Sequence, residues 1–200
     1  MGSFLGGLRS LPPHGLGALA VLLLYAVQSE VRFGARARSH SAGASDRRST
    51  IAVSLAAAIP VLGFVLAMQT DWLRGFPLPG MPAAGWAGVA LGGLGLAVRI
   101  WAVLTLRERY TRTLLIQDQH AVERSGPYRW VRHPGYLGSL LSLNGVAAAS
   151  GSVAVLAASL AATLAAYAYR IRVEDEMLVR RFGEAYASYR RQVGALIPFV

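Results

Sequence analysis

Apolar and polar positions alternate along this chain in long blocks, with runs rich in Ala, Leu, Val and Gly separated by short arginine-rich segments. A helix that crosses a membrane needs about 20 mostly apolar residues. Three runs have about this length: 15–31, 50–70 and 83–106. The first has no convincing small-x-small cleavage site after a charged segment, so we interpret it as an anchor and not as a signal peptide.

The fourth apolar run, 136–169, is too long for one crossing and suits two helices joined by a tight turn. The turn is expected within "ASGSV", residues 149–153. The pattern therefore predicts an all-α integral membrane protein with about five transmembrane helices, in a single domain spanning 1–200. We divide it into three N-terminal spans within 1–110 and a second half, 111–200, that contains the helical hairpin.

The charges of the polar segments predict an orientation in the membrane. The formal net charge is +10, all basic residues are arginine, and the segments after the first, third and fifth spans are rich in it. Such segments stay in the cytoplasm, which puts the N-terminus outside and the C-terminus inside. A basic chain of this kind fits an anionic membrane surface better than nucleic acid. The lysine-free composition hints at a bacterial genome, so we expect the inner membrane.

Composition and spacing remove several other sites. Without cysteine there is no disulfide, thiolate metal site or cysteine nucleophile, and we expect no metal ligands. The stretch "LGGLGLAVR", 91–99, looks like a glycine-rich nucleotide loop but lies within an apolar helix, so helix packing through Gly88 and Gly92 is favoured. Arg99 lies inside the third span, where we favour snorkelling to the membrane surface over a place in a cavity wall.

The stretch "GPYRWVRHPGYLG", 126–138, concentrates special residues where the third loop meets the fourth span. Pro127 and Pro134 interrupt any long helix, so the backbone is expected to be irregular there, which a membrane protein tolerates where the chain lines a cavity or is buried. His133 and Tyr136 flank a helix start whose N–H groups can hold an anion. Spacing alone leaves His133 open as an interfacial or a functional histidine.

A second polar segment follows the hairpin. Arg170 and Glu174 are four residues apart, and Tyr167 shares their helix face. A simple ion pair that supports the helix remains an alternative for the first two. Phe182, Tyr186 and Tyr189 then recur at helical spacing among charges, which predicts an amphipathic C-terminal helix at the membrane surface, with aromatic packing.

These two segments, "H…SGPYRWVRHPGYLG" and "RIRVEDEMLVRRFGEAYASYRRQV…IP", lie on either side of the hairpin and resemble the isoprenylcysteine carboxyl methyltransferase family, within a wider group that includes phospholipid N-methyltransferases. The likeness covers about residues 112–198. It implies S-adenosylmethionine as methyl donor, held at the cytoplasmic face. The cofactor-binding residues that it implies are Thr113, His120, Ala121, Val122, Glu123, Tyr128, His133, Pro134, Gly135, Tyr136 and Glu174.

The same resemblance implies that Arg170 and Glu174 are catalytic and that Arg170, with Tyr167 beside it, contacts the acceptor. Asp175 departs from the family's frequent second glutamate, and Glu123 stands where a small or apolar residue is common, so this residue is expected to contribute its backbone. In this interpretation Glu174 pairs with a positive group of the cofactor, and His133 with the helix start holds its carboxylate. Arg132 and Arg129 are expected to meet lipid headgroups.

The function expected is transfer of a methyl group to a lipophilic acceptor in the bilayer, through a carboxylate, amine or thiol of an isoprenoid, lipid or small molecule. No obligate protein partner is evident, and in a bacterium a prenylated protein is a less plausible acceptor than a small molecule. Two alternatives remain: an NADPH-dependent membrane enzyme similar to sterol reductases, and a non-enzymatic membrane scaffold or carrier.

Overall fold

The structure, a computed structural model, describes residues 12–33, 48–74, 77–106 and 122–198. These residues form helices and connecting turns, with two isolated β-bridges and no strand among them. The helices are α2 (Pro13–Phe33), α3 (Ser49–Gln69), the short α4 (Asp71–Arg74), α5 (Ala83–Leu106), the 3₁₀ turn η4 (Gly126–Arg129), α6 (Pro134–Ala149), α7 (Val153–Phe182) and α8 (Glu184–Gln192).

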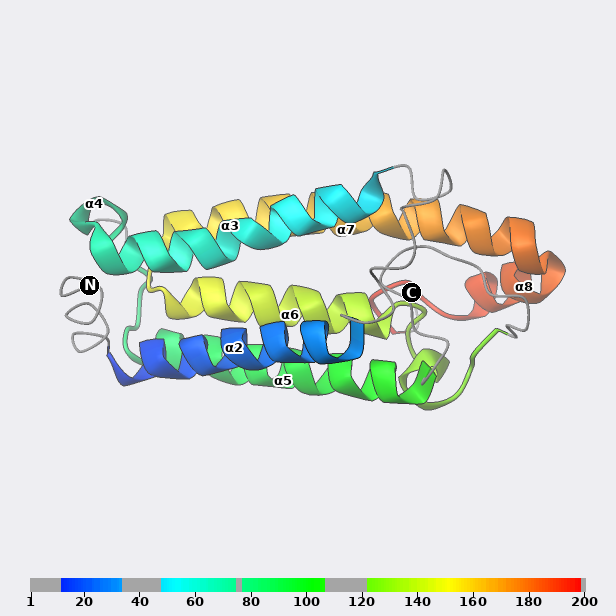
Figure 1. The fold of residues 1–200 in the computed structure, drawn as a ribbon, viewed down its shortest axis with the longest axis horizontal. Helices are drawn as coiled ribbons and strands as arrows, with labels where there is room; N and C mark the ends of the chain where they lie inside the picture. The colour runs from blue at the N-terminus through cyan, green and yellow to red at the C-terminus, as the bar shows by residue number, and fades with distance from the viewer. Residues whose placement is uncertain (1–11, 34–47, 75–76, 107–121, 199–200) are drawn as a thin grey trace.

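Helix α6 is the centre of the bundle. It packs against α2 and α5 on one side and against α3 and α7 on the other (Figure 1). Most of its residues are buried, whereas the outward faces of the surrounding helices expose leucine, isoleucine and tryptophan. An apolar outer surface around a buried central helix is the arrangement of a protein whose solvent is lipid.

Three helices are long and apolar enough to cross a membrane, over Ser49–Ala67, Ala83–Leu106 and Val153–Phe182. Helix α2 is apolar over the shorter range Pro13–Ser29, and α6 has 16 residues. The prediction of an all-α integral membrane protein is confirmed; five crossings stay a prediction, although five long helices lie at the expected places. Helix α6 ends at Ala149 and α7 begins at Val153, so the hairpin turn lies within the expected segment.

Helix α7 is longer than a membrane requires. Its 30 residues span about 45 Å, against about 30 Å of hydrocarbon. The first part of α7 is apolar and the last part, from Arg170 onward, is rich in charge. The polar end of α7 therefore extends beyond the hydrocarbon layer, beside the start of α6 and the short helix α8 (Figure 1).

Helices α5 and α6 approach each other closely along a row of glycines. A Cβ atom on Gly145 would lie 2.5 Å from the carbonyl oxygen of Gly88, and one on Gly95 would lie 2.5 Å from the amide nitrogen of Ser142. Both neighbours are backbone atoms that cannot move aside. Small residues allow this kind of approach between membrane helices. The glycine-rich stretch of the third span therefore packs helices, as expected, and forms no phosphate loop.

Gly145→Ala tests this contact. The added methyl group collides with the backbone of α5, and overpacking of this kind costs about 1–3 kcal/mol. We expect a lower midpoint of thermal unfolding for the detergent-purified variant. Gly93→Ala is the matched control, because a Cβ atom there has nothing within 4 Å. Equal midpoints for the two variants would show that the close approach is not needed.

Candidate active site

The start of α6 is bent, as the sequence predicted. Gly126 takes a positive φ of 55° and begins the 3₁₀ turn, with Pro127 following it. The next residues run alongside the C-terminal tail: the amide of Arg132 donates to the carbonyl of Gly194 at 2.8 Å, and that of His133 to Ala195 at 3.0 Å. The tail therefore fixes the position from which α6 departs.

His133 caps α6 and faces two carboxylates of α7. Its side chain is buried; Nε2 lies 3.0 Å from Oδ1 of Asp175, and Nδ1 lies 3.5 Å from Oε2 of Glu174. Its ring also stacks on Tyr136, with centroids 5.3 Å apart. Because both ring nitrogens face carboxylates, this placement favours a role in holding Glu174 and Asp175. It does not favour the expected contact with a cofactor carboxylate, which like charges would repel.

The carboxylate of Asp175 is bonded by side chains from the start of α6 and from α8. It accepts hydrogen bonds from Nη2 of Arg132 at 3.1 Å and from the hydroxyl of Tyr186 at 2.5 Å, besides its contact with His133. The guanidinium of Arg190 lies 3.7 Å away at the protein surface. Asp175 thus joins α7 to the start of α6 and to α8. Sequence reasoning missed this role; the available signal was an acidic residue beside Glu174 with tyrosine and arginine after it.

One expectation about a neighbouring residue is wrong. Arg132 was expected to meet lipid headgroups, but its side chain turns inward to Asp175 and to the backbone carbonyls of Arg190 and Val193. The aromatic face of α8 packs on the protein: Tyr186 and Tyr189 are each 3% exposed, and the latter donates to the carbonyl of Tyr128. Buried polar groups of a protein are hydrogen-bonded, and both Arg132 and Tyr189 find their acceptors within the protein.

Burial changes the acidity of both tyrosines. Burial and the nearby carboxylate of Asp175 raise the pKa of Tyr186 far above its usual value, and burial raises that of Tyr189 to about 12. Both phenols therefore remain protonated and act as hydrogen-bond donors over the whole physiological range.

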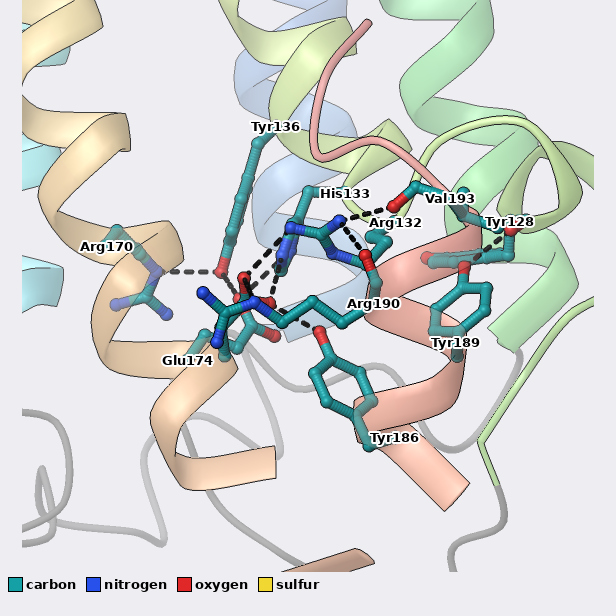
Figure 2. A network of polar contacts seen from close by, with 11 residues as sticks. Tyr128, Arg132, His133, Tyr136, Arg170, Glu174, Tyr186, Tyr189, Arg190 and Val193 are labelled. Atoms are coloured by element: carbon teal, nitrogen blue, oxygen red, sulfur yellow. Dashed lines mark hydrogen bonds and ion pairs between the residues drawn. The ribbon is translucent and has the colours of Figure 1, made fainter. Parts of the chain in front are cut away.

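Glu174, Tyr136 and Arg170 form a second, connected group. The hydroxyl of Tyr136 donates to Oε2 of Glu174 at 2.5 Å and accepts from Nε of Arg170 at 2.9 Å. Figure 2 shows this hydroxyl between the two charged side chains. Tyr167 packs against the ring of Tyr136 at 5.3 Å. The four side chains come from α6 and α7, so the two sequence segments meet, as the hairpin geometry requires.

Exposure separates Glu174 from Asp175. The side chain of Glu174 is 22% exposed, whereas that of Asp175 is 5% exposed. Successive helix residues point about 100° apart, so neighbouring carboxylates can serve different purposes. Glu174 has a carboxylate that a ligand can reach, and Asp175 has one that the protein itself uses.

The other predicted residues lie around this centre or outside the described chain. Tyr128 is buried against α5, its hydroxyl 3.5 Å from the carbonyl of Ala102, on the far side of the network from Arg170 (Figure 2). Glu123 accepts from the amides of Arg124 and Ser125, so its carboxylate shapes the local turn. Val122 precedes it, and Pro134 and Gly135 form the buried first turn of α6. Three predicted residues lie outside the described residues: Thr113, His120 and Ala121.

Arg99 corrects a further expectation. It does not snorkel: the residue is 8% exposed and its guanidinium donates to Gln28 at 2.9 Å and to Ser139 at 2.6 Å. A weaker bond reaches the carbonyl of Gly135, and the ring of Tyr25 lies 4.9 Å away. The polar groups of α2 and α6 satisfy this arginine inside the bundle, which removes the reason for it to reach the surface.

The part of the chain that carries most of these side chains matches a known family of proteins. The model of the isoprenylcysteine carboxyl methyltransferase family matches residues 89–180, which include α6 and most of α7. The chain is therefore similar to this family in the segment that carries the candidate site. The solved structure of a eukaryotic intramembrane Ras methyltransferase of the same family shares its fold, with a TM-score of 0.66 and 22% identity over 96% of this chain and 70% of the other.

Two curated proteins show the range of relatives. A protein-S-isoprenylcysteine O-methyltransferase of Tribolium castaneum is 27% identical over 146 residues, 68% of this chain and 52% of that protein. The cobalt-zinc-cadmium resistance protein CzcN of Cupriavidus metallidurans is 33% identical over 138 residues, 69% of this chain and 58% of that protein. The alignments thus cover little more than half of these two relatives.

Asp175→Asn tests the joining role of this carboxylate. The substitution keeps the shape but leaves the buried charge of Arg132 without its partner, at a cost of about 3 kcal/mol in the free energy of unfolding. We expect a clearly lower unfolding midpoint in detergent. Glu176→Gln is the control, since Glu176 is exposed and its pair with Arg180 spans 3.9 Å. Asp175→Asn with the stability of Glu176→Gln would contradict the assignment.

Proposed function

We propose that this protein is an integral membrane methyltransferase that transfers a methyl group from S-adenosylmethionine to a lipophilic acceptor. The observation that carries the proposal is the Tyr136 hydroxyl between Glu174 and Arg170, at the polar end of a membrane-spanning hairpin. Glu174 and Arg170 follow Tyr136 by 38 and 34 residues in sequence, and both bond to its hydroxyl. One anionic and one cationic side chain at the same point suit two ligands that carry opposite charges.

The residues present fit the proposed cofactor. S-adenosylmethionine carries a sulfonium, an amino group, a carboxylate and an adenine, and when bound it supplies an electrophilic methyl group. The reachable carboxylate of Glu174 is suited to one of the two positive groups. Tyr136 orients that carboxylate through a 2.5 Å hydrogen bond, and its ring with that of Tyr167 offers aromatic surface beside it.

Arg170 suits the acceptor. The residue is 3% exposed, and its guanidinium bonds to the Tyr136 hydroxyl, which also bonds to Glu174. A carboxylate acceptor is already anionic, so it needs orientation and charge complementarity and no general base. The guanidinium of arginine is planar and permanently charged, so, held in a fixed orientation, it would attract and aim an acceptor oxygen. Among the acceptors expected from the sequence, a carboxylate on an isoprenoid or lipid therefore fits best.

The position of Tyr167 and Arg170 along α7 suits a lipophilic acceptor. Tyr167 and Arg170 lie where the apolar part of α7 gives way to its charged part. An acceptor with its chain in the bilayer would present its polar end at this level. We place the enzyme in a bacterial inner membrane with this end facing the cytoplasm, as the distribution of arginine predicts.

Binding titrations with the purified protein test the cofactor. We expect the wild type to bind S-adenosylmethionine, and Glu174→Gln to weaken that binding roughly 10- to 100-fold, because a charge-assisted bond contributes about 1.5–3 kcal/mol. Tyr136→Phe should weaken it less. Glu176→Gln, two residues away and exposed, should bind as the wild type does.

The competing functions predict other results. Binding of NADPH without binding of S-adenosylmethionine would favour the reductase-like enzyme. A scaffold or carrier predicts that Glu174→Ala and His133→Ala leave the protein's effect in cells unchanged. Either result would overturn the methyltransferase.

A further inference from the structure

Arg170 is held from two directions. Its Nε donates to the hydroxyl of Tyr136 on α6, at 2.9 Å. Its Nη1 donates to the hydroxyls of Ser49 at 3.0 Å and of Thr50 at 2.8 Å, both in the first turn of α3. These two residues precede Arg170 by 121 and 120 positions, in the half of the chain where the sequence showed only generic apolar helices.

The two hydroxyls bond to a cation on another helix. Ser49 and Thr50 follow Arg48, the N-cap of α3, whose side chain makes no capping bond, and both hydroxyls accept from the guanidinium of Arg170. A cation beside the positive end of a helix dipole is electrostatically unfavourable. The contact is therefore a poor device for stabilising α3.

The same contact is well suited to aiming Arg170. A guanidinium is planar, so fixing Nε at one point and Nη1 at another fixes the whole group. Each of these three hydroxyls is neutral and orients the guanidinium through a hydrogen bond. Ser49 is fully buried, and α3 lies alongside α7 (Figure 1), so the anchoring point is itself rigid.

We propose that Ser49 and Thr50 are positioning residues that set the direction of the Arg170 guanidinium toward the polar end of the acceptor. The first turn of α3 thereby belongs to the acceptor side of the active site. This proposal rests on the proposed methyltransferase function.

The test compares steady-state kinetics of the purified full chain in detergent, with methyl-labelled S-adenosylmethionine and N-acetyl-S-farnesylcysteine as a lipophilic carboxylate probe. Ser49→Ala/Thr50→Val removes both hydroxyls. We expect kcat/KM for the probe to fall roughly 10- to 100-fold, because misorientation of a positioning group has costs of this size. The affinity for S-adenosylmethionine should stay within about twofold of the wild type, since Glu174 is untouched.

Three controls separate positioning from folding. Thr50→Ser keeps a hydroxyl and should retain most of the activity. Ser54→Ala removes an exposed hydroxyl one turn along α3, which bonds to the Thr50 carbonyl, and should behave as the wild type. In an Arg170→Ala background, loss of the two hydroxyls should cause no further decrease, because residues that act as a unit are not additive.

The outcomes distinguish the two proposals. A wild type that binds S-adenosylmethionine and methylates the probe, with the double variant equal to Ser54→Ala, overturns the positioning role alone. The same conclusion follows if the double variant loses cofactor affinity in parallel with activity, or if its effect adds in full to that of Arg170→Ala. A wild type that neither binds the cofactor nor methylates the probe overturns the proposed function, and the positioning role falls with it.

Discussion

At the polar end of the bundle, one buried carboxylate receives hydrogen bonds from two separate parts of the chain. Asp175 of α7 is bonded by Arg132 and His133 at the start of α6 and by Tyr186 of α8. A buried carboxylate is costly unless its oxygens are satisfied, so these donors must stay where they are. The irregular start of α6, the end of α7 and the short α8 are consequently fixed in one arrangement.

The arrangement of the candidate site follows from that constraint. With α6 and α7 fixed, Tyr136 is placed where its hydroxyl meets both Glu174 and Arg170. His133 links the two regions, because one ring nitrogen faces Asp175 and the other faces Glu174. The protein thus uses one carboxylate of an adjacent pair for its own structure and keeps the other within reach of a ligand. Preorganisation of this kind is what a reaction governed by positioning requires.

Local patterns in the sequence predicted the helices and the meeting of the two polar segments. The apolar runs and the turn of small residues between them are local patterns in the sequence. The hairpin that brings Tyr136 near Arg170 could therefore be predicted. The resemblance supplied Glu174 and Arg170 as site residues, a role that stays a prediction. Contacts over long separations were not predicted. Arg99 and Arg132 were both expected at the membrane surface, because their neighbours in sequence do not show that Gln28, Ser139 or Asp175 is available in space.

The central claim is that Tyr136, Glu174 and Arg170 bring a methyl donor and a lipophilic acceptor together. The most direct measurement is incubation of the purified protein with methyl-labelled S-adenosylmethionine and a lipid extract of its host, followed by identification of the labelled product. The account predicts label in a lipid-soluble molecule, on an oxygen of a carboxylate, with loss of labelling in Arg170→Ala. Absence of any labelled product, or equal labelling by Arg170→Ala, would contradict it.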